Sequence, residues 1–220
     1  MTEELLSIFL REIKIFGEGT FFCTQFFESF TSENYSHHEI ALHPYLDETI
    51  TSEWMNVILK MKKDWIGHKE ITGVRSHSCA YTQRLGVNLF KSDFKYVSNI
   101  TLPPLAEVKP FRYPWGIYEY PIFYMDNMDF NSGLFFNDHE KFSKNIIEYS
   151  LKTDKVFIFD FHPIHLLLNS PDQNFYNKWF NLGRPKEMRY SGYGTLSFFN
   201  DLNREMEKSK IKSKSISKLK

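Results

Sequence analysis

HEIALHPYLD, at residues 38–47, is the stretch of sequence that best indicates the fold. Residues 39–43 form a short apolar run that predicts a buried strand, and this strand ends on His43. Asp47 follows shortly afterwards. Zinc and similar cations take imidazole nitrogen and carboxylate oxygen as ligands, so this pair is a candidate metal site. The structural alternative is that His43 only ends a strand and Asp47 caps the next helix.

The composition is that of one globular domain with a substantial core. The chain has 220 residues, of which 42% are hydrophobic and 17% aromatic. Aromatic-rich clefts bind sugars, although aromatic side chains also fill cores. There are two cysteines, so no disulfide framework is expected. The sequence shows no signal peptide and no apolar run of membrane-spanning length, so we expect a cytoplasmic protein.

Positive charge is concentrated in one segment of the chain. The formal net charge is zero, but residues 208–220 carry six lysines and no acid, which leaves residues 1–207 mildly acidic. An acidic body gives no sign of nucleic-acid binding. The Lys/Ser-rich segment 208–220 has the low complexity of a disordered, solvated tail, and contact with an anionic surface is the alternative. Residues 1–207 are therefore the expected folded domain.

Helical and extended patterns alternate along the chain. Strands that alternate with helices form βαβ units, so the sequence predicts an α/β fold with mainly parallel strands. Strands are predicted at residues 20–24, 39–43, 71–75, 96–100, 117–125 and 156–161. Helices are predicted at residues 2–16, 52–63, 82–93, 139–151 and 198–208, and loops at residues 105–116 and 169–193.

Ionisable residues stand at the ends of four predicted strands, namely His43, Arg75 with His77, Asp126, and His162. In parallel α/β folds, ligands bind at the carboxyl ends of the strands, so this convergence favours an enzyme. His162 suits general acid catalysis near neutral pH, and Asp126 is a candidate to orient it. Arg75 can orient a carboxylate through a bidentate pair, and His77 is either a ligand or a loop histidine. The alternatives for His162 and Asp126 are a structural histidine and a surface turn aspartate.

Five segments share an order along the chain that is typical of one enzyme family. They are GTFFCT (19–24), HEIALH (38–43), GVRSHS (73–78), PIFYMD (121–126) and FHPIH (161–165). In this order the sequence resembles the polysaccharide deacetylases of the NodB-homology type, carbohydrate esterase family 4. It looks most similar to the divergent branch found among O-antigen and capsule biosynthesis proteins. The resemblance covers roughly residues 5–200.

The resemblance implies a distorted (β/α)7-type barrel that hydrolyses N-acetyl groups on a sugar or polysaccharide precursor with a divalent metal, zinc or similar. By the matched motifs, His43 is a metal ligand and His162 is the catalytic acid. Arg75 and Asp126 are expected to orient reacting groups, while Asp47 and His77 complete the metal site. The side chains expected to contact the carbohydrate are Tyr45, Trp115, Tyr124 and His165.

Two departures from the family pattern concern the metal and the base. The second metal histidine of the family is replaced here by Asp47. The family's first strand, which carries an Asp-Asp pair, should precede the helix at residues 2–16, and this sequence begins with that helix. We therefore expect a deacetylase-like hydrolase whose start omits this strand, and weak or no deacetylase activity from this chain. The alternative is a non-catalytic relative that binds a sugar or a partner. A further alternative is a membrane-surface protein acting through residues 208–220.

Overall fold

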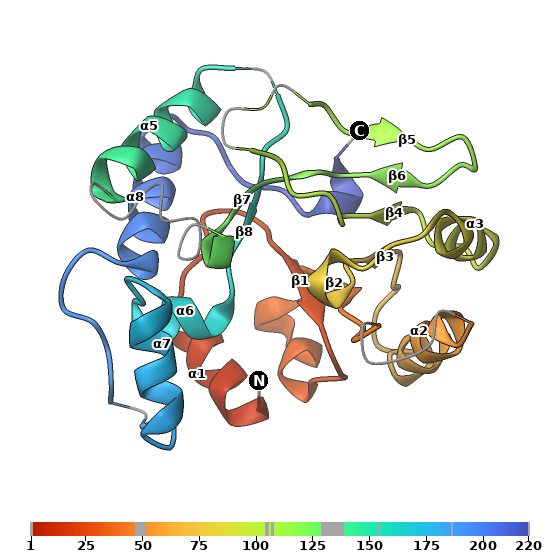
Figure 1. The fold of residues 1–220 in the computed structure, drawn as a ribbon, viewed down its shortest axis with the longest axis horizontal. Helices are drawn as coiled ribbons and strands as arrows, with labels where there is room; N and C mark the ends of the chain where they lie inside the picture. Colours follow the sequence, from red (N-terminus) through yellow and green to blue (C-terminus); the bar gives the residue numbers. More distant parts are fainter. Residues whose placement is uncertain are drawn as a thin grey trace. The chain divides into compact units, whose positions relative to one another are not determined.

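The computed structural model divides the chain into two compact units (Figure 1). The sheet unit comprises residues 17–102, 108–122 and 213–220, and the helical unit comprises residues 1–16, 103–107 and 123–212. The domain predicted over residues 1–207 thus contributes to both units, and each unit has buried apolar residues of its own. The residues that the structure describes are 2–46, 52–103, 106, 108–128, 139–153, 155–185 and 187–219.

The sheet unit is organised around six strands in the order β1-β2-β3-β4-β6-β5. From β1 to β6 the neighbouring strands pair in parallel, and β5 pairs antiparallel with β6. The predicted α/β fold with mainly parallel strands is therefore confirmed, while closure into a barrel stays a prediction. The strands are β1 (Thr20–Cys23), β2 (Glu39–Leu42), β3 (Gly73–Val74), β4 (Tyr96–Val97), β5 (Phe111–Arg112) and β6 (Tyr118–Glu119).

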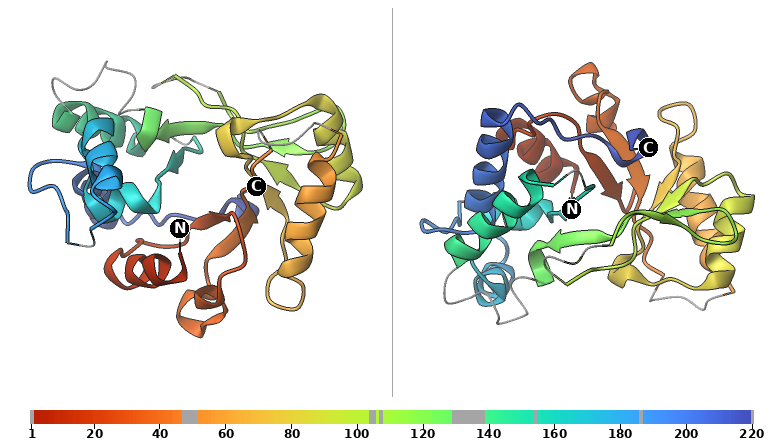
Figure 2. Two further views of the ribbon diagram at one scale, coloured as in Figure 1. Left: turned by 60° about the horizontal axis from the view of Figure 1, so that its bottom comes forward. Right: turned by 90° about the horizontal axis from the view of Figure 1, so that it is seen from above.

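Two helices connect the central strands of this sheet. α2 (Trp54–Asp64) follows β2, α3 (Gln83–Lys91) follows β3, and the two helices lie side by side (Figure 2). Thr82 caps α3, because its Oγ1 accepts the N–H of Leu85 at 3.1 Å. Each helix buries an apolar face, and the crossovers place β2, β3 and β4 side by side in parallel.

The helical unit packs an aromatic core around a two-stranded sheet of β7 and β8. In the core, Phe123 and Tyr124 of β7 lie with Ile146, Ile147 and Phe198 of the surrounding helices. None of the helices in the described part of the chain has the length and apolar composition that a bilayer crossing requires. The elements are α1 (Glu3–Glu12), β7 (Ile122–Met125), α5 (His139–Leu151), β8 (Ile158–Asp160), α6 (Pro163–Leu168), α7 (Gln173–Asn181) and α8 (Thr195–Lys208).

The strand predicted over residues 117–125 is interrupted in the structure. β6 ends at Glu119 and β7 begins at Ile122, with Pro121 between them. A proline has no N–H for a sheet hydrogen bond, so it separates two strands where the apolar pattern suggests one. As a result β6 joins the sheet of the sheet unit, while β7 pairs with β8. The break also places Asp126 directly after β7.

The region predicted as a loop over residues 169–193 contains the helix α7. Asp172 caps this helix, because its Oδ1 accepts the N–H of Phe175 at 2.8 Å. Trp179 is the buried residue of α7, and its Nε1 donates to the carbonyl of Pro185 at 3.0 Å. The cap and the aromatic spacing are helix signals that the polar composition of the segment concealed.

The lysine-rich segment, for which the sequence predicts disorder, lies ordered against β1 in the structure. Ser213 bridges Gly17 in parallel, and a 3-10 turn follows at Ile216–Lys218. The Lys218 ammonium lies 2.7 Å from the Glu18 carboxylate, and the Ile216 side chain is buried. A low-complexity composition predicts disorder only when the segment finds no partner, and here residues far away in the sequence supply one.

Candidate functional site

His43 stands directly after β2, and its imidazole is held in one orientation. Its backbone N–H donates to the carbonyl of Cys23 at 2.8 Å, and its Nδ1 lies 2.7 Å from the carbonyl oxygen of Arg75. A carbonyl oxygen can only accept, so Nδ1 carries the proton and Nε2 carries the lone pair. Metal-binding histidines commonly have this arrangement, with the second ring nitrogen donating to a backbone carbonyl. The donor chemistry of His43 therefore fits the predicted role as a metal ligand.

His77 is the second imidazole of this part of the sheet unit. The His43 and His77 ring centroids are 5.8 Å apart at an interplanar angle of 76°. Two imidazoles on one tetrahedral zinc place their centroids roughly 5 Å apart, so the separation of these two rings is close to that of a shared ion's ligands. The next two residues, Ser78 and Cys79, have φ of 52° and 54°, a region that non-glycine residues rarely adopt. Asp47, the third predicted ligand, lies outside the described residues.

Arg75, after β3, is a buried cation with 4% of its surface exposed. Its Nε donates to the carbonyl of Ser98 at 3.1 Å and its Nη2 donates to Ser98 Oγ at 2.7 Å. The guanidinium carbon also lies 4.1 Å from the centroid of the Phe22 ring. These contacts hold the side chain against Phe22 of β1 and against Ser98, which follows β4. The predicted bidentate pairing with a carboxylate stays a prediction.

Sequence reasoning missed Glu119, a fully buried carboxyl group in β6. Its Oε1 accepts the N–H groups of Asn99 and Ile100 at 2.8 and 3.2 Å, and Tyr113 donates its hydroxyl to Oε2 at 3.3 Å. Burial raises the pKa of Glu119, and the hydrogen bonds and the charge of Arg75 only partly oppose that rise. Glu119 thus shapes the chain after β4. A carboxylate inside a predicted apolar strand was the signal that could have revealed it.

In the helical unit, Asp126 and His162 form an imidazole–carboxylate pair. Asp126 follows β7 and is fully buried, and His162 follows β8 with its side chain 38% exposed. The His162 backbone N–H donates to Asp126 Oδ2 at 2.7 Å, and His162 Nδ1 lies 2.6 Å from Oδ1. Two contacts from one residue fix both the position of the chain and the rotation of the ring. The structure thus brings together two residues that the sequence had assigned to catalysis.

His165 is a second histidine beside the same carboxylate. It lies in the first turn of α6, 7% of its side chain is exposed, and its Nδ1 is 3.3 Å from Asp126 Oδ2. Burial by itself would raise the pKa of Asp126, but the two neighbouring imidazoles outweigh burial and hold that pKa well below its ordinary value. Asp126 is therefore a charged group at neutral pH. The predicted role of His165 was contact with substrate, and the structure places it at this carboxylate.

The remaining residues predicted to contact carbohydrate fall in different surroundings. Tyr45 is 44% exposed, and its ring centroid lies 4.3 Å from that of His77. Trp115 is half-buried, stacks on Tyr113 at 4.6 Å, and donates its Nε1–H to Tyr81 at 3.3 Å. Tyr124 is only 4% exposed and packs in the core of the helical unit. Tyr45 and Trp115 thus present aromatic surface in the sheet unit, whereas Tyr124 fills a core.

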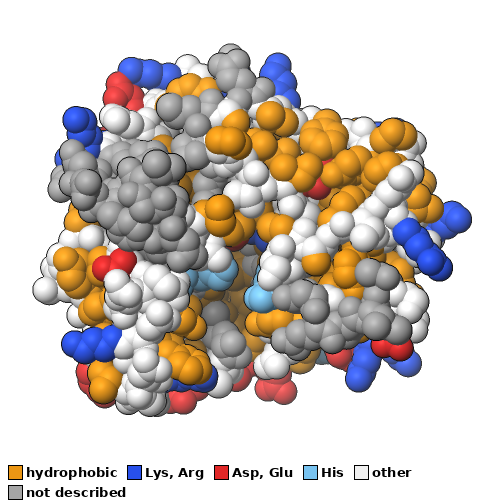
Figure 3. All heavy atoms as spheres, in the orientation of Figure 1, with side chains coloured by type: hydrophobic (Ala, Val, Ile, Leu, Met, Phe, Trp, Pro, Cys, Tyr) orange, Lys and Arg blue, Asp and Glu red, His pale blue; other side chains and the backbone are white. Residues whose placement is uncertain are grey.

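Hydrophobic side chains also gather on the surface over β5 and β6, as Figure 3 shows. Tyr118 of β6 is 45% exposed, and the guanidinium carbon of Arg112 lies 5.8 Å from the centroid of its ring. Flat aromatic faces of this kind stack on sugar rings as well as on protein surfaces. This surface is therefore compatible with a carbohydrate ligand, without being specific for one.

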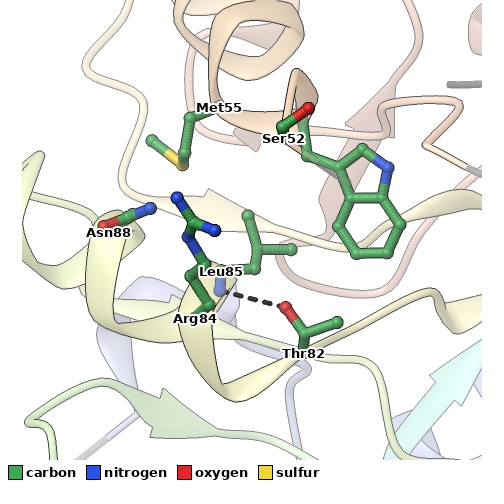
Figure 4. Close-up of a pocket in the computed structure, with 7 residues that line it drawn as sticks. Ser52, Met55, Thr82, Arg84, Leu85 and Asn88 are labelled. Carbon is green, nitrogen blue, oxygen red and sulfur yellow. Dashed lines mark hydrogen bonds between the residues drawn. The ribbon is translucent and has the colours of Figure 1, made fainter. Parts of the chain in front are cut away.

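A small pocket of about 200 Å³ lies between the starts of α2 and α3 (Figure 4). Met55 and Leu85 are apolar residues of its lining, and Arg84 and Asn88 are polar ones. The hydrogen bond from the Leu85 N–H to Thr82 is the N-cap of α3. The lining includes no histidine or carboxylate and no residue predicted to act in catalysis, so this pocket contributes nothing to the chemistry described above.

A parallel α/β sheet with polar strand ends, together with an Asp–His pair after two further strands, is the arrangement expected of a polysaccharide deacetylase. The profile of the WbmS-like polysaccharide deacetylases matches residues 4–180. The chain therefore belongs to the WbmS-like polysaccharide deacetylase family, as the sequence motifs predicted.

A solved structure and the curated sequences complete the comparison. The crystal structure of WbmS from Bordetella bronchiseptica, assigned as a polysaccharide deacetylase involved in O-antigen biosynthesis, superposes with a TM-score of 0.72 at 16% identity. The alignment covers 93% of this chain and 86% of that one, so the two chains share a fold. No curated protein sequence matches the chain significantly.

Proposed function

We propose that this protein hydrolyses an N-acetyl group on a sugar or polysaccharide precursor of the kind used in O-antigen biosynthesis. The observation that carries the proposal is the Asp126–His162 pair, in which a buried carboxylate lies 2.6 Å from Nδ1 of a partly exposed imidazole. Membership of a polysaccharide deacetylase family supports the reaction class. The aromatic rings of Tyr45 and Trp115 support a carbohydrate substrate.

The Asp126–His162 pair is arranged to protonate the nitrogen of the amine as it leaves. With Nδ1 donating to Asp126, His162 directs Nε2 away from the carboxylate, and the carboxylate stabilises the imidazolium form. During hydrolysis the oxygen of water bonds to the acyl carbon and the carbon–nitrogen bond breaks. The imidazolium of His162 gives its Nε2 proton to the nitrogen, one proton of the water returns to His162 and the other goes to solvent, so that a free amine and acetate leave. Asp126 holds the ring in place throughout and does not itself transfer a proton.

His43 and His77 supply the proposed site for a divalent ion such as zinc. The fixed tautomer of His43 and the 5.8 Å separation of the two rings fit such an ion. A divalent ion bound there would supply Lewis-acid chemistry and acidify a bound water. Arg75 stiffens this part of the sheet unit, because its carbonyl fixes the His43 ring while its side chain is bound to Ser98.

Acetate release from N-acetylated oligosaccharides tests the proposal. We expect weak but measurable release by the purified chain, loss of release on chelation, and a reduction of about 100- to 10,000-fold in His162→Ala. His37→Gln is the matched control, because His37 is exposed and is not among the proposed catalytic residues. Absence of release together with retained binding of the sugar would instead support the alternative, a non-catalytic sugar-binding relative.

A further inference from the structure

We propose that Asp126, His162 and His165 form a second binding site for a divalent transition-metal ion, within the helical unit and built from residues other than His43 and His77. One ligand atom from each of the three residues can be chosen so that all lie within 4.8 Å of one another. The set offers two imidazole nitrogens and one carboxylate oxygen. Such a set suits zinc, cobalt or nickel better than magnesium or calcium, which prefer oxygen ligands.

The distances within the cluster are close to those of a metal centre. The ring centroids of His162 and His165 are 5.2 Å apart, and two imidazoles on one tetrahedral zinc place them roughly 5 Å apart. Ligand atoms on such an ion are separated by roughly 3.3 Å. His165 Nδ1 already lies 3.3 Å from Asp126, whereas His162 Nδ1 lies 2.6 Å away. An ion therefore requires the shorter contact to lengthen by less than about 1 Å, and any pair of ligand atoms near the 4.8 Å limit of the cluster to approach by about 1.5 Å.

The three side chains are also held where an ion would need them. His162 precedes Pro163 at the start of α6, and His165 follows in the first turn of that helix. The backbone N–H of His162 binds Asp126 at 2.7 Å, which ties the start of the helix to the end of β7. The His165 ring packs edge-on against Tyr176 at 5.3 Å between centroids. The ligands thus sit on supported elements, and the partly exposed His162 provides access from solvent.

An ion at this site would replace the hydrogen bond between His162 Nδ1 and Asp126. The ion-bound cluster and the hydrogen-bonded pair are therefore alternative states of the same residues. If the pair acts as proposed above, excess transition metal removes the orientation of the acid. The metal site itself does not depend on that function, because it needs only the three ligands.

Zinc binding measured by calorimetry on the chelator-treated full chain tests the site without any substrate. We expect His165→Gln to weaken one zinc-binding event by 10-fold or more, and Asp126→Asn to do the same. His43→Ala and His37→Gln should retain that event. Circular dichroism checks the fold of each variant, and His165→Gln keeps the test valid if Asp126→Asn does not fold.

Cobalt absorption gives a second readout on the same variants. We expect a band typical of tetrahedral nitrogen and oxygen ligation in the wild type and in His43→Ala, and its loss in His165→Gln. Zinc isotherms and cobalt spectra that are the same in folded His165→Gln as in the wild type would overturn the proposal. Zinc binding without acetate release would leave the metal site intact and count against the proposed deacetylase function only.

Discussion

Asp126 accepts two hydrogen bonds from His162, one from the backbone N–H at 2.7 Å and one from the ring Nδ1 at 2.6 Å. The two carboxylate oxygens are used separately, so the carboxyl plane, the start of α6 and the imidazole are fixed together. A histidine held in this way keeps Nδ1 protonated toward the carboxylate, and its imidazolium form carries the transferable proton on Nε2, which faces away from the carboxylate.

Asp126→Asn should abolish most of the proposed activity while preserving the size of the side chain. An amide can present its NH2 group to His162 Nδ1, which favours the wrong tautomer and removes the negative charge that stabilises the imidazolium. We expect kcat for acetate release to fall by about 100- to 10,000-fold. His37→Gln, at an exposed position, serves as the control. A change of less than about tenfold in a folded Asp126→Asn protein would contradict this role.

The ordered carboxyl-terminal segment should stabilise the protein through Ile216. Its side chain is 4% exposed, and its backbone N–H donates to Thr20 Oγ1 at 2.8 Å. Ile216→Ala should lower the free energy of unfolding by about 2 kcal/mol, at the low end for a buried isoleucine because the site is peripheral. Urea denaturation measures the change. Lys214→Ala, at an exposed lysine of the same segment, should change stability by no more than about 0.5 kcal/mol, and equal effects would indicate a disordered segment.

Acid should destabilise the protein through His38. Its Nδ1 accepts the N–H of Gly19 at 3.1 Å, and burial, with the nearby charges of His37 and Lys69, lowers the pKa of His38 to about 4. The unfolded chain therefore takes up this proton at higher pH than the folded one. Stability should be complete above about pH 6.5 and fall progressively between about pH 6.5 and 4, by about 1–3 kcal/mol from this group.

Urea denaturation at pH 7 and pH 4.5 measures that loss. His38→Asn retains an acceptor but cannot titrate, so the difference in stability between the two pH values should be smaller than in the wild type. His68→Gln leaves His38 in place and should keep the larger difference. An equal pH dependence in His38→Asn and the wild type would show that His38 does not set it.

Gly73 should tolerate no side chain, because a Cβ there would lie 2.0 Å from Cζ of Tyr96 on the neighbouring strand. Gly73→Ala should cost about 1–3 kcal/mol of stability, since the ring must shift and loses its 2.9 Å hydrogen bond to Glu39. Thermal or urea denaturation measures the cost. In a Tyr96→Leu background the same substitution should cost clearly less. Costs that are the same in both backgrounds would exclude this clash as the cause.

Local patterns predicted much of the fold. The apolar run at residues 39–43 became β2, and the helix predicted at residues 139–151 became α5 within the same bounds. The first helix was predicted to reach residue 16 but ends at Glu12. Asn203 of α8 binds the carbonyl of Lys14 and the N–H of Phe16, so a distant side chain holds that stretch outside the helix. Periodicity along the chain carries no information about such a partner.

In the candidate site, too, local patterns predicted some features, whereas contacts with distant residues could not be predicted. The rule that ligands bind at strand ends selected Asp126 and His162, and the structure places these two residues in contact. The rule could not distinguish a substrate contact from a neighbour of Asp126, which is where His165 lies. Glu119 was missed because its structural role depends on hydrogen bonds from three residues outside β6, namely Asn99, Ile100 and Tyr113. Contacts between residues that are distant in the sequence decide these roles, and the order of residues along the chain does not show which of them meet.

The contact between Ser215 and Glu18 has a consequence for how the protein is made. The Ser215 hydroxyl donates to the Glu18 carboxylate at 3.0 Å across a separation of 197 residues, and Ser213 bridges Gly17 nearby. On the ribosome, β1 emerges long before the segment that covers it. Until translation reaches this segment, β1 lacks the Gly17–Ser213 bridge and the hydrogen bond from the Ile216 N–H to Thr20, and a strand edge without such contacts can pair with another nascent chain. The need for chaperones during synthesis should therefore depend on the residues from 213 onward, which are translated last.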